Sequence, residues 1–241
     1  MTGSQPKILF WDIEATNLVA NIGNILCIGY KILGEKTKVL SVRNYKGFKA
    51  DPTDDKRLVK DFAEILTSCD MMVTWYGKKF DLPFLSSRLL YHGLKPTPSI
   101  PHFDGWYVAK YRLRLHSNRL ASVQDFLELP SAKTPLSFRE LSRSRAGHVP
   151  SLKSIEHHCY MDVEVLEQAY HKLKPYAGAY HPNLAALGYE RNICPACGGK
   201  RIQSRGFMVA QTRVYRRHQC VECGNWFRST QSERHMTAQV R

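Results

Sequence analysis

Residues 7–18, KILFWDIEATNL, decide how the chain folds, because they combine an apolar strand with two closely spaced acids. Residues 7–13 predict a first strand, and the side chains of a strand alternate between its two faces. Asp12 and Glu14 therefore point to the same side. Two like charges this close repel each other, and burial disfavours their ionisation. A bound divalent cation would offset both effects, because Mg²⁺ prefers anionic oxygen ligands. The alternative is a pair of exposed acids at the end of a strand.

The residues that follow predict a mixed sheet with helices packed on it. Turn signals at residues 21–24 and 34–35 separate two further strands, over residues 25–33 and 37–43. Apolar residues at helical spacing predict a helix over 54–69, followed by a strand over 71–75 and a helix over 81–92. Beyond these, we expect helices over 120–127 and 154–173, a loop over 131–150 and a linker over 176–188. This order of elements indicates an α/β fold.

Two further acids lie in segments that each suggest a site only weakly. Asp81 stands in WYGKKFDLPFL, residues 75–85, at the predicted start of a helix, where it could simply be an N-cap. Asp162 stands in HHCYMDVEVL, residues 157–166, near the apolar stripe of the last predicted helix. Taken alone it would be an ordinary helix acid.

Together with WDIEATNL, residues 11–18, these segments resemble the three motifs of the DEDD, or DnaQ-like, exonuclease family, which has a ribonuclease-H-like fold. One departure is Tyr76-Gly77, where family members often carry Asn-Gly. The resemblance implies that Asp12 bridges two Mg²⁺ or Mn²⁺ ions, that Glu14 and Asp162 complete the first site, and that Asp81 helps to hold the second. It also implies 3′–5′ hydrolysis of phosphodiester bonds by a two-metal-ion mechanism.

The resemblance further implies a general base, which is histidine in one subclass of the family and tyrosine in another. His157 matches the His-x4-Asp spacing of the histidine subclass, whereas His158 stands four residues before Asp162, where the other subclass has tyrosine. At about 100° per residue, His158 shares a helical face with Asp162, and His157 reaches that face only if the helix begins late. We favour His157, because its spacing matches a subclass that uses histidine.

Two CxxC turns, CPACG at residues 194–198 and CVECG at 220–224, predict a structural zinc ribbon. The thiolates of Cys194, Cys197, Cys220 and Cys223 would make a tetrahedral site that suits Zn²⁺. Thioredoxin-like chemistry would need a single CxxC beside a βαβ pattern, so we favour zinc over redox activity or iron. The remaining three of the seven cysteines are scattered, which indicates a reducing compartment rather than a disulfide framework.

The formal net charge of +14 is unevenly distributed, since residues 191–241 contain ten Lys and Arg but only two acids. A basic module suits a polyanionic partner, although charge could also serve solubility alone. We expect nucleic acid, with DNA favoured over RNA. The candidate contacts lie in the ribbon and in a second basic and aromatic stretch, and they are Trp106, Arg112, Arg114, Arg213, Arg216, Arg217, Trp226 and Arg228. Alternatively, the aromatic residues pack inward, and the ribbon docks a protein.

The sequence thus predicts a catalytic domain over residues 1–175, a linker over 176–190, and a zinc ribbon with a basic tail over 191–241. The polar N-terminus and the lack of a long apolar run indicate a soluble, cytoplasmic protein. The expected function is that of a 3′–5′ exonuclease on single-stranded DNA. Two alternatives stay open, a structure-selective endonuclease with the same metal centre and a catalytically silent nucleic-acid-binding module, because fold alone does not separate them.

Overall fold

A computed structural model of the protein describes residues 6–130, 136–187 and 192–235. The chain divides into two compact units, one formed by residues 6–171 and one that contains residues 172–241. Residues 131–135 of the predicted loop, 188–190 of the predicted linker and 236–241 of the predicted tail lie outside the described residues. Within the described part of the chain, no helix combines the length and the apolarity needed to cross a membrane.

The first unit is built on a mixed sheet of five strands in the order β3-β2-β1-β4-β5. The strands are β1 (Ile8–Ala15), β2 (Ile25–Ile32), β3 (Lys38–Ser41), β4 (Met71–Thr74) and β5 (His102–Asp104). The central strand β1 pairs antiparallel with β2 and parallel with β4. At the edges, β3 is antiparallel to β2 and β5 is parallel to β4. The predicted mixed sheet is confirmed, and the three-residue β5 is an addition to it.

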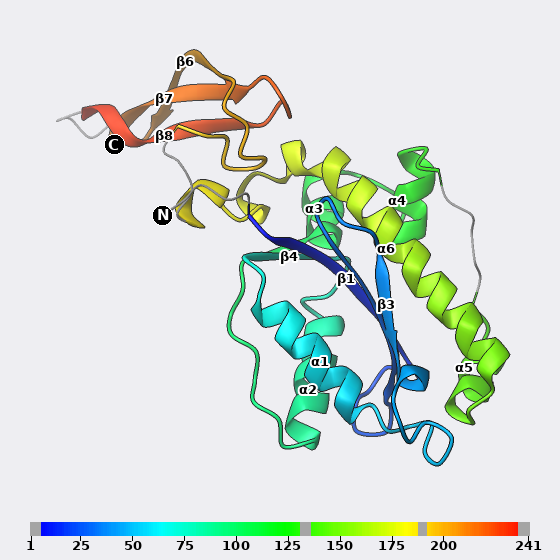
Figure 1. Ribbon diagram of the computed structural model, residues 1–241. Coiled ribbons are helices and arrows are strands. Elements are labelled where there is room, and N and C mark those ends of the chain that lie inside the picture. The colour runs from blue at the N-terminus through cyan, green and yellow to red at the C-terminus, as the bar shows by residue number, and fades with distance from the viewer. Residues whose placement is uncertain (1–5, 131–135, 188–191, 236–241) are drawn as a thin grey trace. The chain divides into compact units, whose positions relative to one another are not determined.

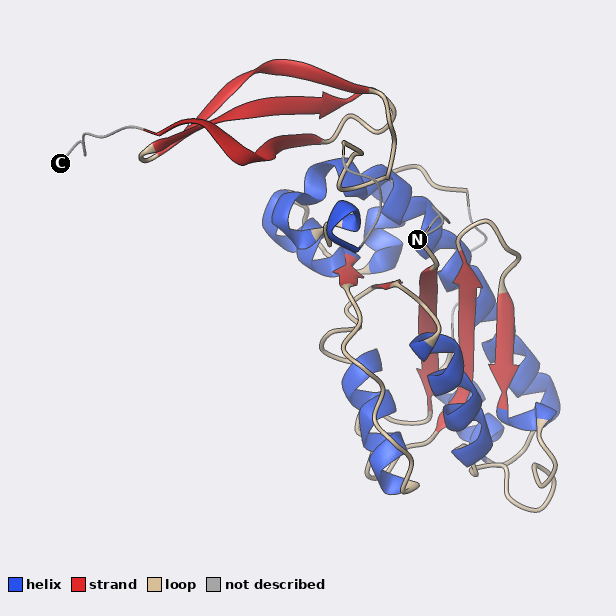
Figure 2. Ribbon diagram, turned by 60° about the vertical axis from the view of Figure 1, so that its left-hand side comes forward, coloured by secondary structure: helices blue, strands red, loops and turns tan. Residues whose placement is uncertain are grey.

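The side chains of β1 alternate between two layers of helices. Helices α1 (Lys56–Thr67) and α2 (Asp81–Tyr91) cover one face of the sheet, and α6 (Val149–Ala177) covers the other (Figures 1 and 2). The rings of Trp11 and Phe62 of α1 lie 5.0 Å apart, whereas Phe10 meets Tyr170 of α6 at 5.3 Å. By the same alternation, the two acids of β1 lie on the face covered by α6.

Shorter helices connect β5 to α6, and one of them lies where a loop was predicted. These helices are α3 (Gly105–Arg112), α4 (Leu120–Phe126) and α5 (Phe138–Arg145), and the 3-10 turn η1 (Val42–Asn44) follows β3. The hydroxyl of Ser137 accepts a hydrogen bond from the N–H of Glu140 at 3.2 Å, and the Glu140 carboxylate accepts one from the N–H of Ser137 at 3.0 Å. This capping box satisfies N–H groups that would otherwise be unpaired, and it begins α5.

The second unit holds a three-stranded antiparallel sheet. Its strands are β6 (Ile202–Ala210), β7 (Arg213–Cys220) and β8 (Trp226–His235), with β7 in the middle. Two 3-10 turns, η2 (Gly178–Tyr180) and η3 (Leu184–Leu187), occupy part of the predicted linker, and α6 reaches into it. The buried cluster of this sheet consists mainly of cysteines, with Ala196 and Phe227. A core this small indicates that the unit depends on a cross-link through its cysteines.

Candidate metal centres and nucleic-acid surfaces

Four acids from three separate segments gather around β1. Asp12 and Glu14 belong to β1, Asp81 begins α2, and Asp162 lies on α6. Burial raises the pKa of Asp12 well above its usual range, and the negative charges of Asp81, Asp162 and Glu14 raise it further. Because each of these charges acts on Asp12, the four carboxylates form one electrostatic cluster, which we call the acidic centre.

Two acids of the acidic centre, Glu14 and Asp162, lie close to His158, and the ligand atoms of these three residues are all within 4.8 Å of one another. Nε2 of His158 is 3.6 Å from Oε1 of Glu14 and 3.5 Å from Oδ2 of Asp162. The Oδ1 atom of Asp81 accepts a hydrogen bond from the backbone N–H of Ile13 at 3.1 Å. That bond links the first residue of α2 to β1.

A close contact between β2 and α6 brings Asp162 to the two acids of β1. Gly29 pairs with Asp12 across the sheet, and its N–H donates to Sγ of Cys159 at 3.0 Å. The Cys159 thiol in turn donates to the carbonyl oxygen of Asp12 at 3.5 Å. A Cβ atom added at Gly29 would lie 2.8 Å from the carbonyl oxygen of Cys159 and 3.0 Å from a methyl carbon of Val163. The absence of a side chain at Gly29 therefore lets α6 approach this closely.

Burial raises the pKa values of the other three acids as well, and for Glu14 repulsion by other members of the centre adds to it. The pKa of Glu14 rises to about 8, first through burial and then through the charges of Asp162 and Asp81. Burial raises the pKa of Asp81 to about 7, and it raises that of Asp162 although the neighbouring His158 opposes the change. Buried, crowded carboxylates form the oxygen-rich donor set that hard divalent cations prefer. The residues present therefore fit Mg²⁺ or Mn²⁺.

The geometry brings His158, and not His157, to the acidic centre. Helix α6 begins at Val149, so it is fully formed before residue 157, and the late start that His157 would need is not present. His157 is exposed, whereas the side chain of His158 is 22% exposed and faces Glu14 and Asp162. The preference for His157 required a helix that begins late, and the point where α6 begins could not be located from the sequence; which histidine acts as the base stays a prediction.

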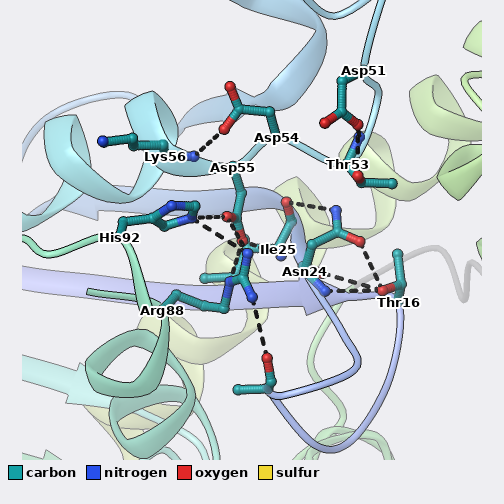
Figure 3. Close-up of polar contacts among 11 residues, drawn as sticks. Thr16, Asn24, Ile25, Asp51, Thr53, Asp54, Asp55, Lys56, Arg88 and His92 are labelled. Carbon is teal, nitrogen blue, oxygen red and sulfur yellow. Dashed lines mark hydrogen bonds and ion pairs between the residues drawn. The ribbon is translucent and has the colours of Figure 1, made fainter. Parts of the chain in front are cut away.

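A buried polar network holds the loop that follows the two acids of β1 (Figure 3). The fully buried carboxylate of Asp55 accepts hydrogen bonds from the Arg88 guanidinium at 2.8 and 2.9 Å and from the N–H of Ile25 at 2.8 Å. Arg88 also donates to the carbonyl oxygen of Ala20 at 3.2 Å. The network thus ties α2 and the residue before α1 to the middle of the loop, at Ala20, and to its far end, at Ile25. Sequence reasoning missed Asp55 and Arg88, since their separation of 33 residues forms no motif.

A second missed acid, Asp104, orders the chain just before Asp81. Its buried carboxylate accepts hydrogen bonds from the N–H groups of Tyr76 at 2.8 Å, Lys78 at 3.0 Å and Trp106 at 3.1 Å. The last of these bonds caps α3. Tyr76 adopts a φ of 67°, which is strained for a residue with a side chain, and its ring lies 4.9 Å from that of Trp106. Strain of this kind often accompanies functional sites.

The stretch around Trp106 forms helix α3, and its predicted contacts are only partly brought together. Trp106 is half-buried, and Nζ of Lys110 lies 4.6 Å from its ring centroid. Arg112 ends the helix and Arg114 follows it, both with exposed side chains. Trp106 and Tyr107 of α3 contact Tyr76 and Lys78 in the loop that leads to Asp81, which agrees with inward packing of the aromatic residues, and contact with nucleic acid stays a prediction.

The four ribbon cysteines converge on one point, as their spacing predicts. Their sulfur atoms all lie within 4.8 Å of one another, with Cys194 to Cys223 at 3.7 Å and Cys197 to Cys220 at 3.7 Å. Tetrahedral zinc with Zn–S bonds of about 2.3 Å separates its sulfur ligands by about 3.8 Å, and a disulfide would bring them to about 2 Å. The residues present therefore fit Zn²⁺ and could form a closed zinc ribbon.

Local hydrogen bonds prepare the cysteine cluster for a metal. The N–H groups of Ala196 and Gly199 donate to the sulfurs of Cys194 and Cys197, both at 3.4 Å. A hydrogen bond with the Cys197 thiol is the main reason why the pKa of Cys194 falls to about 5. Gly198, which ends the first turn, has a φ of 73°, a conformation that glycine adopts without strain.

The predicted ribbon contacts all lie on β7 or β8. Arg213, Arg217, Trp226 and Arg228 have exposed side chains, and Arg216 is half-buried. Arg216 is ion-paired with Glu233, with a distance of 2.8 Å between Nε and Oε1. Phe227 packs on the cysteine cluster, whereas Trp226 is 50% exposed. Trp226 thus lies outside the ribbon's small core.

The family model that matches the chain is described as the RNase H superfamily, and it covers residues 9–174. No curated protein matches the sequence. Among solved structures that match is a family B DNA polymerase from the hyperthermophilic archaeon Pyrobaculum calidifontis, with a TM-score of 0.58 and 13% sequence identity. The match covers 87% of this chain and 33% of that chain, so this protein spans about a third of the polymerase's length. A likeness at this identity shows the fold alone.

Proposed function

The chain belongs to the RNase H superfamily, and from this family and the clustering of four acids in the acidic centre we propose that it is a 3′–5′ exonuclease acting on single-stranded DNA. In this proposal, residues 1–175 form the catalytic domain, residues 176–190 a linker, and residues 191–241 a zinc ribbon that aids nucleic-acid binding. The polarity rests on the resemblance of the three acidic motifs to DEDD exonucleases.

The observation that carries the proposal is the convergence of Asp12, Glu14, Asp81 and Asp162. The negative charges of the other acids raise the pKa of two members of the set: all three act on Asp12, and those of Asp162 and Asp81 act on Glu14. A purely structural role does not account for this crowding, because repulsion between buried like charges destabilises the fold. Divalent cations held by the four acids would neutralise the charge that develops on the phosphate and on its entering and leaving oxygens.

The chain's own residues would orient the substrate water and move its proton. Nε2 of His158 lies between Glu14 and Asp162 and can accept a proton from a water molecule beside them. The water oxygen forms a bond to phosphorus while the bond from phosphorus to the 3′ oxygen breaks. The 3′ oxygen takes up a proton from solvent. The products are a nucleoside 5′-monophosphate and a strand one nucleotide shorter, which again ends in a 3′ hydroxyl.

Digestion of a single-stranded DNA oligonucleotide labelled at its 5′ end tests the proposal. With Mg²⁺ or Mn²⁺, the label should remain on a ladder of strands that shorten one nucleotide at a time, and mononucleotides should be released. The Asp12→Asn variant is the matched control and should leave the substrate intact. RNA, duplex and branched substrates of the same length then establish the preferred nucleic acid.

A circular single-stranded DNA separates the proposed exonuclease from its rivals. An exonuclease leaves the circle intact, whereas a structure-selective endonuclease with the same centre linearises it. If neither circular nor linear substrates are cut with any divalent cation, the hydrolytic function is refuted. The protein would then be a nucleic-acid-binding module.

A further inference from the structure

The two faces of the ribbon sheet carry different side chains, because successive residues of a strand point to opposite sides. One face carries Arg213, Tyr215 and Arg217 from β7 and Trp226 and Arg228 from β8. The guanidinium carbon of Arg228 lies 3.7 Å from the ring centroid of Tyr215, and that of Arg217 lies 5.2 Å from the Trp226 ring. Arg213 also donates a hydrogen bond to the hydroxyl oxygen of Tyr215, and Arg217 pairs with Arg228 across the sheet. These contacts place the five side chains together, and we call them the basic-aromatic face.

The opposite face differs in that its rings are stacked and its arginine is paired with an acid. Arg216 lies over the ring of Phe207 at 5.1 Å, and His218 stacks on Phe227 with ring centroids 5.4 Å apart. The charge of Arg216 is compensated by Glu233, at 2.8 Å. This face therefore combines packed rings with a neutralised arginine.

The acids of the ribbon leave the basic-aromatic face uncompensated. Residues 192–235 contain two acids, Glu222 and Glu233. Glu222 accepts a hydrogen bond from the backbone N–H of Arg201 at 3.3 Å and lies 3.7 Å from Nε of the same residue. Because Glu233 pairs with Arg216, neither acid forms an ion pair with the arginines of the basic-aromatic face within the described part of the ribbon. The three arginines of the basic-aromatic face thus carry a positive charge that neither acid of residues 192–235 offsets through an ion pair.

We propose that the basic-aromatic face binds single-stranded nucleic acid, with its arginines on the phosphates and Trp226 stacked on a base. Half of Trp226 is exposed, and an exposed ring can stack only on a base that is not already paired. Arg213 and Arg217 are four strand residues, about 13 Å, apart, a length that about four stacked nucleotides span at 3.4 Å each. That the bound strand is also the substrate of the enzyme rests on the proposed function. That the face binds a single strand is inferred from its own side chains.

Equilibrium binding by the full-length, zinc-loaded protein tests the assignment of the face. All variants are made in the Asp12→Asn background, so that fluorescence anisotropy of a labelled oligothymidylate is not disturbed by hydrolysis. Arg217→Ala and Arg228→Ala remove one charge each from the basic-aromatic face. Arg216, one of the contacts expected from the sequence, lies on the opposite face and is paired with Glu233, so Arg216→Ala removes the same charge there and is the matched control.

We expect Arg217→Ala, Arg228→Ala and Trp226→Ala each to raise the Kd for the single strand by about 5-fold or more, while Arg216→Ala changes it less than about 2-fold. The two arginine variants of the basic-aromatic face should also reduce the slope of log Kd against log salt concentration by about one. Trp226→Phe keeps a stacking ring and should retain most of the affinity. Zinc content measured on each variant shows that the ribbon is folded.

The proposal is overturned if Arg216→Ala weakens binding as much as the other arginine variants do. It is equally overturned if zinc-loaded Trp226→Ala binds like its parent, or if duplex DNA binds as tightly as the single strand. Hydrolysis is measured separately, in protein with Asp12 intact. If the protein does not hydrolyse DNA but its basic-aromatic face still binds the single strand, the proposed function alone is refuted. If the protein hydrolyses DNA but substitutions on the basic-aromatic face leave binding unchanged, this inference alone is refuted.

Discussion

Replacing Asp81 by Asn should stabilise the protein when no divalent cation is bound to the acidic centre. Asp81 is 2% exposed, and its Oδ1 accepts a hydrogen bond from the N–H of Ile13 at 3.1 Å. The amide oxygen of Asn can accept the same bond, and the two side chains have nearly the same size. The substitution therefore removes a buried negative charge and little else.

The magnitude follows from the pKa of this carboxyl. Burial raises it from an ordinary value of 3.8 to about 7. Each pKa unit corresponds to about 1.4 kcal/mol, so an ionised Asp81 destabilises the metal-free protein by about 4 kcal/mol. The folded state binds the proton of the Asp81 carboxyl more tightly than the unfolded state does. The free energy of unfolding therefore falls as pH rises from about 4 to about 7, and above that range it has lost the whole contribution. Asp81→Asn abolishes this contribution.

Thermal unfolding at pH 8, in buffer free of Mg²⁺ and Mn²⁺ but with zinc retained, measures the effect. At about 2–4 °C for each kcal/mol, the melting temperature of Asp81→Asn should exceed that of the parent by about 8 °C or more. At pH 5 the difference should shrink, since the folded parent then keeps its proton. Saturating Mg²⁺ should stabilise the parent more than the variant, because it binds the parent more tightly. A variant that melts below the parent at pH 8 without Mg²⁺ would refute the reasoning.

Three other substitutions test separate parts of the account. His158→Ala should lower kcat by about 100-fold or more, while His157→Ala stays near the parent; equal rates for both would exclude a histidine base. Gly29→Ala should destabilise the fold by about 1–3 kcal/mol in urea unfolding and lower activity as well, because its methyl group would displace α6; a neutral result contradicts the close contact. Arg88→Ala should destabilise by about 3–5 kcal/mol, because it leaves Asp55 buried without its cation, and a loss below about 1 kcal/mol would argue against that pairing.

The acids and the ribbon cysteines could be located from the sequence because their signals are short and local. Asp12 and Glu14 are two residues apart on one strand, and alternation fixes their common side. The CxxC turns fix two sulfurs each, and only one arrangement of four sulfurs suits a closed site. The convergence of Asp81 and Asp162 on the same place came from the resemblance of their motifs. It depends on packing contacts such as that between Gly29 and Cys159, which no spacing encodes.

The features that sequence reasoning missed depend on where helices begin and on long-range polar contacts. Helix α6 starts at Val149, five residues before the prediction, and this shift alone moves the preference from His157 to His158. Helix α5 was missed, although Ser137 and Glu140 have the spacing of a capping box. Asp104 orders the chain before Asp81 through hydrogen-bond partners 26 and 28 residues away, and no local sequence pattern predicts such contacts.

Titration of the zinc-loaded protein with Mn²⁺, followed by electron paramagnetic resonance of the free ion, shows whether four acids remote in the chain share one cation-binding centre. We expect Asp12→Asn, Glu14→Gln, Asp81→Asn and Asp162→Asn each to weaken Mn²⁺ binding relative to the parent, with the largest loss at Asp12, on which the other three charges act. Mn²⁺ affinities of Asp81→Asn and Asp162→Asn equal to that of the parent would contradict it.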